Sequence, residues 1–316
     1  MKLLKRIVLI LVVFIAIGYV SISWVLSNRI LKPNATHETT VEKIKIYWNT
    51  TYETLMDPLP SPSDFSVNSF DGLILKGKYF NMSDTSNCAI IMAHGWGVTW
   101  VNMLKYIPAI SECGCDIFMY DHRAHGESGG DFGTGGINES KDLIAVTEWV
   151  QKEYEFNDDQ IGWFGSSWGA AAALTAGAEE KNVAFIIADA PFQNWHSAIF
   201  ERAERDYGNG INFLAPGVMQ MVNWRAGVNY EEASVLNLAD QIEEPVLLIH
   251  SEADQATGYI QSVNISRKLN SNSSFHLTKW GNKHVMDVIN NKEEFTQLVN
   301  NFLKKEKLFQ YDSAGT

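Results

Sequence analysis

The residues best suited to chemistry lie in a short stretch of small side chains, WFGSSWGAA, at residues 163–171. Ser167 has Gly165 two positions before it and Gly169 two positions after it, which gives the pattern G-x-S-x-G. Glycines at these positions permit a sharp strand-to-helix turn that exposes a serine hydroxyl as a nucleophile. Ser166 occupies the variable position of the pattern. The spacing therefore predicts Ser167 as the nucleophile.

A serine nucleophile needs a base and an acid that orients the base, and two later loops supply such groups. Asp254 and His284 each follow an apolar run near the end of the chain. These runs are Pro245–His250 and Ser274–Trp280. The order Ser, Asp, His is the one that accompanies this kind of turn. We therefore expect a triad of Ser167, Asp254 and His284, with Glu252 and Asp287 as the alternatives for the acid.

Short apolar runs that alternate with segments of helical spacing must position these loops. The predicted strands are Cys88–Ala93, Asp116–Tyr120, Ile161–Phe164, Phe185–Asp189, Pro245–His250 and Ser274–Trp280. An earlier hairpin is expected around Asp71-Gly72, and a closing helix at Lys292–Lys305. This alternation predicts an α/β fold with a mostly parallel central sheet and helices on both faces. The catalytic body would span residues 64–308, with a tail at 309–316.

An insertion at residues 192–244, rich in aromatic residues and methionine, separates two of these strands. It predicts a small helical cap above Ser167. The candidates for lining a substrate pocket are Phe200, Phe213, Leu214, Met219 and Trp224. The alternative is that these side chains only pack the cap onto the body.

The first 32 residues differ in composition from the rest of the chain. Residues 7–26 are twenty consecutive uncharged residues, enough for a helix to cross a hydrocarbon core of about 30 Å. The basic residues Lys2, Lys5 and Arg6 precede them and favour a cytoplasmic N-terminus, with the body outside the cytoplasm. We expect a single-pass membrane anchor at residues 1–32, with a cleaved signal peptide as the alternative.

Residues 33–63 contain several prolines and no clear strand pattern. They predict a tether between the anchor and the body, with one helical stretch at Val41–Leu55.

The composition limits the possible partners. The chain has 316 residues, 46% of them hydrophobic and 20% charged, and a formal net charge of −12. A nucleic-acid partner is not expected, because phosphate binding needs a basic surface. Cys88, Cys113 and Cys115 fit neither a disulfide framework nor a four-ligand zinc site, so buried thiols are expected. The expected partners are a small acyl substrate and, through residues 7–26, the membrane.

Several motifs, in order along residues 64–308, resemble those of α/β-hydrolases. They are AHGWG at 93–97, YDHRAHGESGG at 120–130, GWFGSSWGAA at 162–171, PVLLIHSEAD at 245–254 and GNKH at 281–284. The chain is similar to bacterial membrane-anchored serine hydrolases that also resemble monoacylglycerol lipases, serine aminopeptidases and acyl thioesterases. The resemblance implies the same triad, together with an oxyanion hole formed by the backbone N–H groups of Trp96 and Trp168.

In the second of these motifs, Asp121 and Arg123 are expected to tie neighbouring loops together by charge-assisted hydrogen bonds. No catalytic role is expected for His125 or Ser128.

The sequence as a whole predicts a membrane-anchored serine hydrolase that cleaves a carboxylic ester, thioester or amide through an acyl-enzyme, with neither a metal nor an organic cofactor. An acyltransferase or an aminopeptidase with the same triad is an alternative. So is a non-catalytic binding domain of the same fold.

Overall fold

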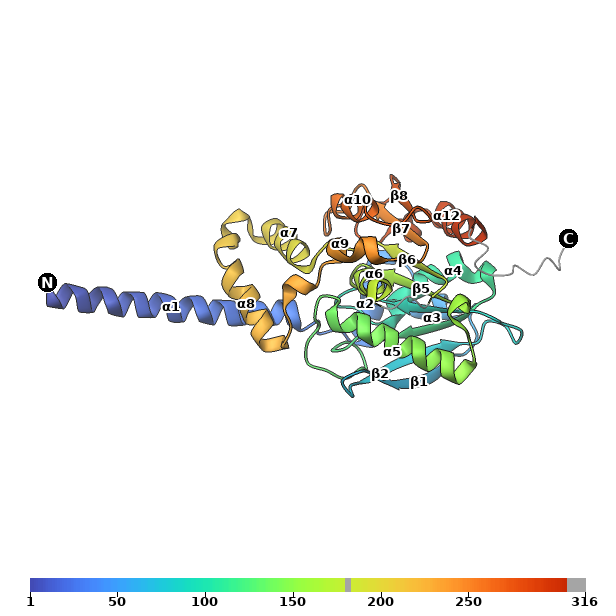
Figure 1. Ribbon diagram of the computed structural model, residues 1–316, viewed down its shortest axis with the longest axis horizontal. Helices are drawn as coiled ribbons and strands as arrows, with labels where there is room; N and C mark the ends of the chain where they lie inside the picture. Colours follow the sequence, from blue (N-terminus) through green and yellow to red (C-terminus); the bar gives the residue numbers. More distant parts are fainter. Residues whose placement is uncertain (180–182, 306–316) are drawn as a thin grey trace.

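The computed structural model describes residues 1–179 and 183–305, so the expected tail at 309–316 lies outside the described residues. The described strands form one eight-stranded sheet in the order β1-β2-β4-β3-β5-β6-β7-β8 (Figure 1). Their bounds are β1 Ser63–Asn68, β2 Ile74–Phe80, β3 Ala89–Ala93, β4 Asp116–Tyr120, β5 Ile161–Ser166, β6 Phe185–Asp189, β7 Val246–Ser251 and β8 Ser274–Thr278. β1 and β2 form the expected antiparallel hairpin, and β3 to β8 run parallel.

Helices cover both faces of the sheet, as the alternating pattern predicts. The α-helices are α1 Lys2–Leu31, α2 His37–Trp48, α3 Tyr52–Met56, α4 Ile107–Ile110, α5 Ile137–Tyr154, α6 Trp168–Glu179, α7 Trp195–Tyr207, α8 Ala215–Ala226, α9 Val235–Leu238, α10 Ile260–Ser266, α11 Asp287–Asn290 and α12 Lys292–Lys305. Helices α5 and α6 pack on one face, and α2, α4 and α12 pack on the other. The fold is therefore the predicted α/β-hydrolase architecture.

Strand β3 illustrates why the central strands are apolar without interruption. Ala89 and Ile91 belong to the core on the α5–α6 face, whereas Ile90 and Met92 belong to the core on the opposite face. Successive side chains of a strand point to opposite faces, so a strand covered on both sides must be apolar at every position.

Residues 33–63 pack on the body instead of hanging free of it. Helix α2 buries Ile44 completely in the core on its face of the sheet, and the Lys43 ammonium donates to the carbonyl oxygen of Gly97 at 2.6 Å. The expected single helix at Val41–Leu55 is interrupted at Asn49, whose φ of +51° ends α2 in the left-handed region. The Thr51 side chain then caps α3.

Helix α1 projects from the body along the long axis of the molecule (Figure 1). It is long and apolar enough to cross a membrane, a property that it shares with signal sequences. Residues 1–17 are exposed along the whole outer part of the helix. Towards its C-terminal end α1 lies against the cap helix α8.

The insertion between β6 and β7 contains α7, α8 and α9 joined by short 3-10 turns. Helices α7 and α8 stand beyond the carboxyl ends of the strands, on the side of the body from which α1 leaves (Figure 1). This placement puts helical structure next to the site predicted for Ser167.

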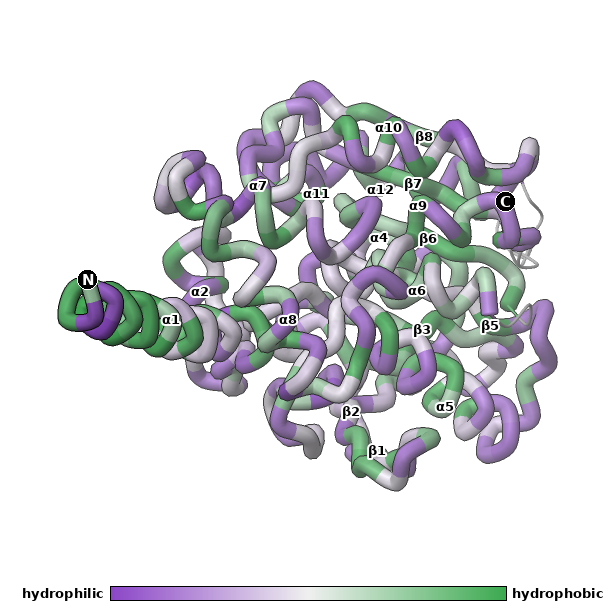
Figure 2. Tube along the Cα trace, turned by 60° about the vertical axis from the view of Figure 1, so that its left-hand side comes forward, coloured by the Kyte–Doolittle hydropathy of each residue, from purple (hydrophilic) through white to green (hydrophobic). Residues whose placement is uncertain are grey.

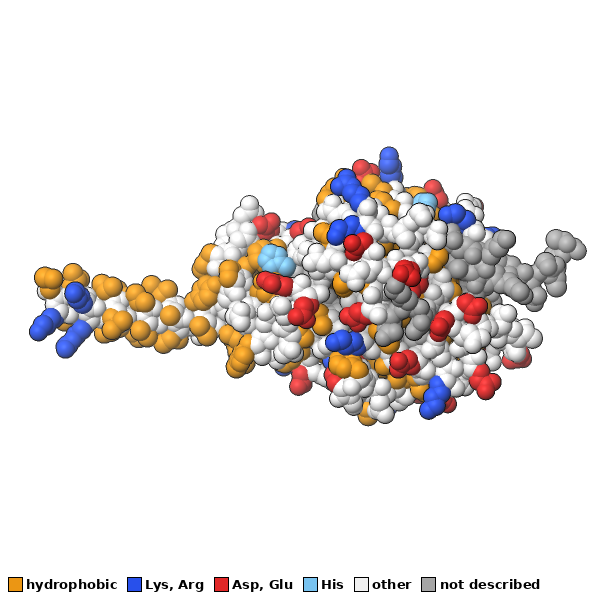
Figure 3. Space-filling view, viewed as in Figure 1, with side chains coloured by type: hydrophobic (Ala, Val, Ile, Leu, Met, Phe, Trp, Pro, Cys, Tyr) orange, Lys and Arg blue, Asp and Glu red, His pale blue; other side chains and the backbone are white. Residues whose placement is uncertain are grey.

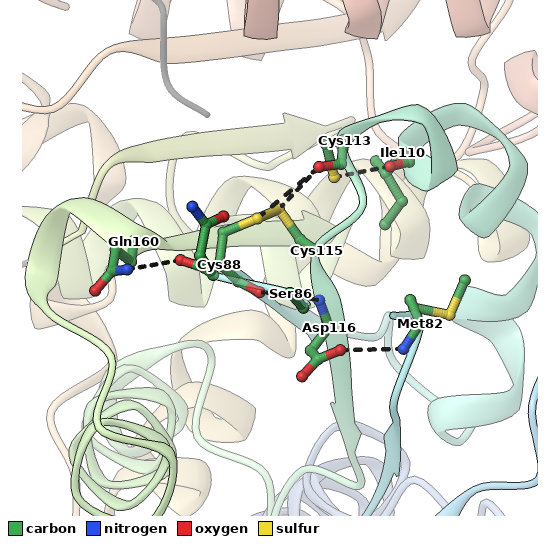
Figure 4. The surroundings of a disulfide bond; sticks show 9 residues. Met82, Ser86, Cys88, Ile110, Cys113, Cys115, Asp116 and Gln160 are labelled. Atoms are coloured by element: carbon green, nitrogen blue, oxygen red, sulfur yellow. Dashed lines mark hydrogen bonds between the residues drawn. A yellow bond between two sulfur atoms is a disulfide. The ribbon is translucent and has the colours of Figure 1, made fainter. Parts of the chain in front are cut away.

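One prediction about the cysteines is wrong, because Cys88 and Cys115 form a disulfide (Figure 4). The two residues directly precede β3 and β4, which pair in parallel with Ala89 opposite Asp116. This register brings the two Cα atoms to 4.7 Å, which is a suitable separation for a disulfide. Cys113 remains a buried thiol, and burial raises its pKa to about 11.

We predict that reducing this disulfide lowers the free energy of unfolding by about 3 kcal/mol, because the bond closes a loop of 27 residues. Thermal unfolding with and without reductant measures the effect. The Cys113→Ala variant keeps the bridge and should respond to reductant as the wild type does. The Cys88→Ser/Cys115→Ser variant should not respond, and a reductant effect that persists in it would contradict the prediction.

Candidate active site

Ser167 lies at a strained turn between β5, which ends at Ser166, and α6, which begins at Trp168. Its φ of +54° places a non-glycine residue in the left-handed region, which costs roughly 1–3 kcal/mol. Its backbone N–H donates to the carbonyl oxygen of Asp189 at 2.7 Å. Neighbouring structure thus holds the turn, and the Ser167 side chain remains partly exposed at the carboxyl edge of the sheet.

The flanking glycines are required by the close approach of strand and helix. A Cβ at Gly165 would lie 2.3 Å from the carbonyl oxygen of Gly169, and a Cβ at Gly169 would lie 2.1 Å from that of Ala93. Both distances are far below van der Waals contact with backbone atoms that cannot move away. The G-x-S-x-G spacing is therefore a packing requirement of this turn as well as a chemical pattern.

The loops after β5, β7 and β8 bring Ser167, Asp254 and His284 together. The Nε2 atom of His284 lies 2.7 Å from the Oγ atom of Ser167, and its Nδ1 atom lies 2.6 Å from the Oδ2 atom of Asp254. Asp254 is buried, whereas the imidazole of His284 is 23% exposed. The arrangement is a continuous hydrogen-bonded chain from a buried carboxylate to a hydroxyl group at the surface of a cavity.

Asp254 has further partners that keep it ionised and fixed. Its Oδ1 atom accepts the backbone N–H groups of Ala256 at 2.8 Å and Thr257 at 3.0 Å. Its Oδ2 atom also lies 3.2 Å from the Nε2 atom of His250. Burial by itself would raise the pKa of Asp254, but the charges and hydrogen bonds of His284 and His250 hold this pKa well below its usual range.

Sequence reasoning missed the role of His250, which is fully buried at the end of β7. Its Nδ1 atom lies 2.7 Å from the Oγ atom of Ser262, which fixes the ring beside Asp254. The separation of four residues between His250 and Asp254 is the one signal that could have indicated the contact.

Three buried histidines hold the loop that carries Trp96. His125 accepts the backbone N–H of Gly97 at 3.2 Å, and His94 accepts that of His122 at 3.0 Å. Burial lowers the pKa of His125 to about 4 and holds that of His94 well below its usual range, so both accepting rings are neutral at neutral pH. A neutral imidazole nitrogen can accept these N–H groups, and the histidines therefore act as supports for the loop.

The prediction for Asp121 and Arg123 is confirmed. Asp121 accepts the backbone N–H groups of Trp100 at 2.9 Å and Glu127 at 3.0 Å. Arg123 donates to both carboxylate oxygens of Asp142 at 2.7 Å, and this bidentate pair is buried. These bonds fasten the loop after β4 to its neighbours.

A cavity of about 560 Å³ opens beside Ser167 and His284, and the side chains that line it are mostly apolar. Trp96 and Trp168 form one wall, with ring centroids 4.5 Å apart. Of the predicted pocket residues, Phe200, Leu214 and Met219 line the cavity. In the described residues, no group of three or more His, Cys, Asp and Glu side chains could hold a metal ion.

The other two predicted pocket residues do not line the cavity. Phe213 and Trp224 are 70% and 71% exposed, on the outer side of the cap. Their rings contact α1, with centroid distances of 6.4 Å from Phe213 to Tyr19 and 5.9 Å from Trp224 to Trp24. The sequence identified an apolar cap but not the direction of each side chain.

The parallel sheet, the strained serine at the end of β5 and the loops that converge on it define an α/β-hydrolase. The chain belongs to the prolyl oligopeptidase family, which matches residues 108–308. It is 32% identical over 241 residues to protein YqkD of Bacillus subtilis, covering 76% of this chain and 78% of that protein.

The solved structures similar to this one include an esterase and a peptidase. Esterase Pf2001 of Pyrococcus furiosus is 25% identical, with a TM-score of 0.65 and coverage of 81% of this chain and 96% of the esterase. Acylaminoacyl peptidase of Pyrococcus horikoshii is 19% identical, with a TM-score of 0.62 and coverage of 84% of this chain and 45% of that chain, which supports the fold alone. The family and the fold together establish a serine hydrolase.

Asp287, considered above as an alternative acid, hydrogen-bonds to another residue. The hydroxyl of Thr278 donates to its Oδ1 atom at 2.7 Å, and the carboxyl group is buried. Burial and the nearby charge of Asp189 raise the pKa of Asp287 to about 7.

We predict that Asp287→Asn stabilises the protein relative to the wild type increasingly as the pH rises. Above the ordinary carboxyl pKa the unfolded wild type loses the Asp287 proton, whereas the folded protein retains it until the pH passes about 7. The free energy of unfolding of the wild type therefore falls with rising pH over this range, and that of the Asn variant does not. The difference should increase by about 3 kcal/mol between about pH 5 and about pH 8 in denaturant titrations. The exposed Asp240→Asn variant is the control, and an equal increase in that variant would refute the assignment.

Proposed function

We propose that the protein is a membrane-anchored serine hydrolase that cleaves a carboxylic ester through an acyl-enzyme on Ser167. The observation that carries the proposal is the hydrogen-bonded chain from Ser167 through His284 to Asp254. A hydroxyl within reach of a base, which a buried carboxylate orients in turn, is the arrangement that activates a serine.

The reaction follows from the positions of these atoms. The Oγ atom of Ser167 attacks the ester carbonyl while Nε2 of His284 takes its proton, and the imidazolium then protonates the leaving alcohol. Water then attacks the carbonyl of the acyl-enzyme while His284 again acts as the base, and the carboxylic acid product leaves. Asp254 holds the imidazole through Nδ1 and stabilises its charged form.

Backbone N–H groups of Trp96 and Trp168 are the proposed oxyanion donors. Trp168 is the first residue of α6, where an N–H group has no carbonyl partner within the helix. Trp96 lies next to Trp168 in the same wall of the cavity, in the loop that the buried histidines support. Two donors fixed in place stabilise the charge that develops on the carbonyl oxygen.

The lining of the cavity favours an ester over a peptide. Phe200, Leu214 and Met219 offer apolar contact to an acyl chain. Arg202, Arg205 and Asp206 also border the cavity, but most of its lining is apolar, and an acyl chain would bind there by burial of apolar surface.

Helix α1 is the proposed anchor, with its N-terminus in the cytoplasm and the catalytic domain outside. The basic residues Lys2, Lys5 and Arg6 at its outer end support this orientation (Figure 3). The Cys88–Cys115 disulfide also supports it, because disulfides persist in oxidising compartments.

We predict that a fluorophosphonate probe labels the purified protein at Ser167. Ser167→Ala should abolish labelling, whereas Ser166→Ala should retain it, because the Ser166 side chain is buried against Tyr106. Labelling is read on a gel and by mass spectrometry of the modified peptide. A folded wild-type protein that takes no label would overturn the proposed function.

We predict that Asp254→Asn lowers kcat for a soluble ester by roughly 10³–10⁴-fold, because the amide cannot hold the imidazole in the reactive tautomer. Steady-state kinetics measure the loss. Glu252→Gln is the matched control, since Glu252 is exposed and lies two residues away. If Glu252→Gln lost activity and Asp254→Asn did not, the acid would be Glu252.

A further inference from the structure

The C-terminal half of α1 is fastened to the cap. The hydroxyl of Tyr19 accepts the backbone N–H of Gly217 at 3.0 Å and donates to the carbonyl oxygen of Phe213 at 3.3 Å. A Cβ at Gly217 would lie 2.3 Å from the Tyr19 ring, so a glycine is needed for this close contact. The helix and the cap therefore meet through fitted surfaces.

Arg225 of α8 forms a second attachment to α1. Its guanidinium donates to the Oγ atom of Ser27 and the Oδ1 atom of Asn28, each at 2.7 Å. It also lies 4.2 Å from the centroid of the Trp24 ring, in cation-π contact. Ser27 is fully buried in this interface. These contacts fix the rotation of α1 about its own axis relative to the cap.

That rotation turns one side of α1 into a wall of the catalytic cavity. Leu26, Arg29 and Ile30 line the same cavity as Ser167 and His284. The Arg29 guanidinium also donates to the hydroxyl of Tyr207 on α7. The pocket beside Ser167 is thus closed on one side by the helix that carries the apolar segment.

The apolar segment and the cap overlap along the helix axis. Residues 7–26 are the uncharged run, yet Tyr19 and Trp24 within it already contact the cap. The cap therefore reaches the level at which the helix leaves a bilayer, and its exposed Phe213 and Trp224 stand at that level. Figure 2 shows that the residues along the outer part of α1 are hydrophobic, and Figure 3 shows hydrophobic side chains on the surface there and on the adjoining end of the body. Aromatic residues at this level are typical of membrane interfaces.

We propose that the cavity bordered by α1 opens towards the membrane interface, and that its substrate is an acyl ester embedded in the bilayer. The inference rests on the proposed function, because it uses the same serine. The acyl chain would pass from the lipid phase along Leu26 and Ile30 into the pocket. Hydrolysis would consume one water and release a fatty acid and an alcohol.

The test uses the full-length protein in phosphatidylcholine vesicles and two reporters with the same leaving group. 4-Methylumbelliferyl oleate resides almost wholly in the bilayer, whereas 4-methylumbelliferyl butyrate is also present in the water. The wild type should hydrolyse both. Hydrolysis of butyrate without hydrolysis of oleate would overturn the inference and leave the proposed function intact. Hydrolysis of neither ester would overturn both.

Variants of α1 test whether this helix borders the path of the acyl chain. Leu26→Trp should lower the ratio of oleate to butyrate hydrolysis by about tenfold, because the larger side chain fills the path of a long chain but not that of a short one. Val25→Trp is the matched control, since Val25 is 59% exposed and lies outside the cavity lining, and it should leave the ratio unchanged. An unchanged ratio in Leu26→Trp, or an equal fall in both variants, would overturn the inference.

Discussion

The contact between β5 and α6 around Ser167 is the constraint on which the rest of the structure depends. Gly165 lets β5 approach α6 until no Cβ fits between them, Gly169 lets α6 approach the end of β3 in the same way, and Ser167 between them has a strained φ of +54°. A serine fixed in this way can act as a nucleophile only if a base and its orienting acid lie at the same edge of the sheet. The parallel arrangement of β5, β7 and β8 ensures this, because the carboxyl ends of parallel strands share one edge.

Most of the sheet could be predicted from the sequence, because strands buried on both faces are apolar at every position. The expected bounds of Asp116–Tyr120 and Phe185–Asp189 agree with those of β4 and β6. The disulfide could not be predicted in the same way. It depends on β3 and β4 being neighbours in the sheet and on their register, and both are tertiary properties. Knowledge of the strand order would have placed Cys88 opposite Cys115.

The same distinction between strand patterns and tertiary packing applies to the candidate site. Ser167, Asp254 and His284 could be found because each follows a strand, and position after a strand predicts which edge a loop occupies. Side-chain direction within the cap could not be found, since Phe213 and Trp224 turn towards α1 and away from the cavity. Their partner is a helix at the other end of the chain. Periodicity within the cap contains no information about that packing.

The attachment of α1 to the cap has a consequence for kinetics. A catalytic domain on a flexible linker samples a volume, whereas one fastened through Tyr19 and Arg225 to a helix that spans the membrane, as proposed above, would keep its serine at one height above the bilayer. An enzyme of the proposed kind would encounter its substrate by lateral diffusion in two dimensions. Its turnover would follow the mole fraction of the ester in the surface rather than the molar concentration in the suspension, so that diluting the vesicles would leave the rate per enzyme unaltered.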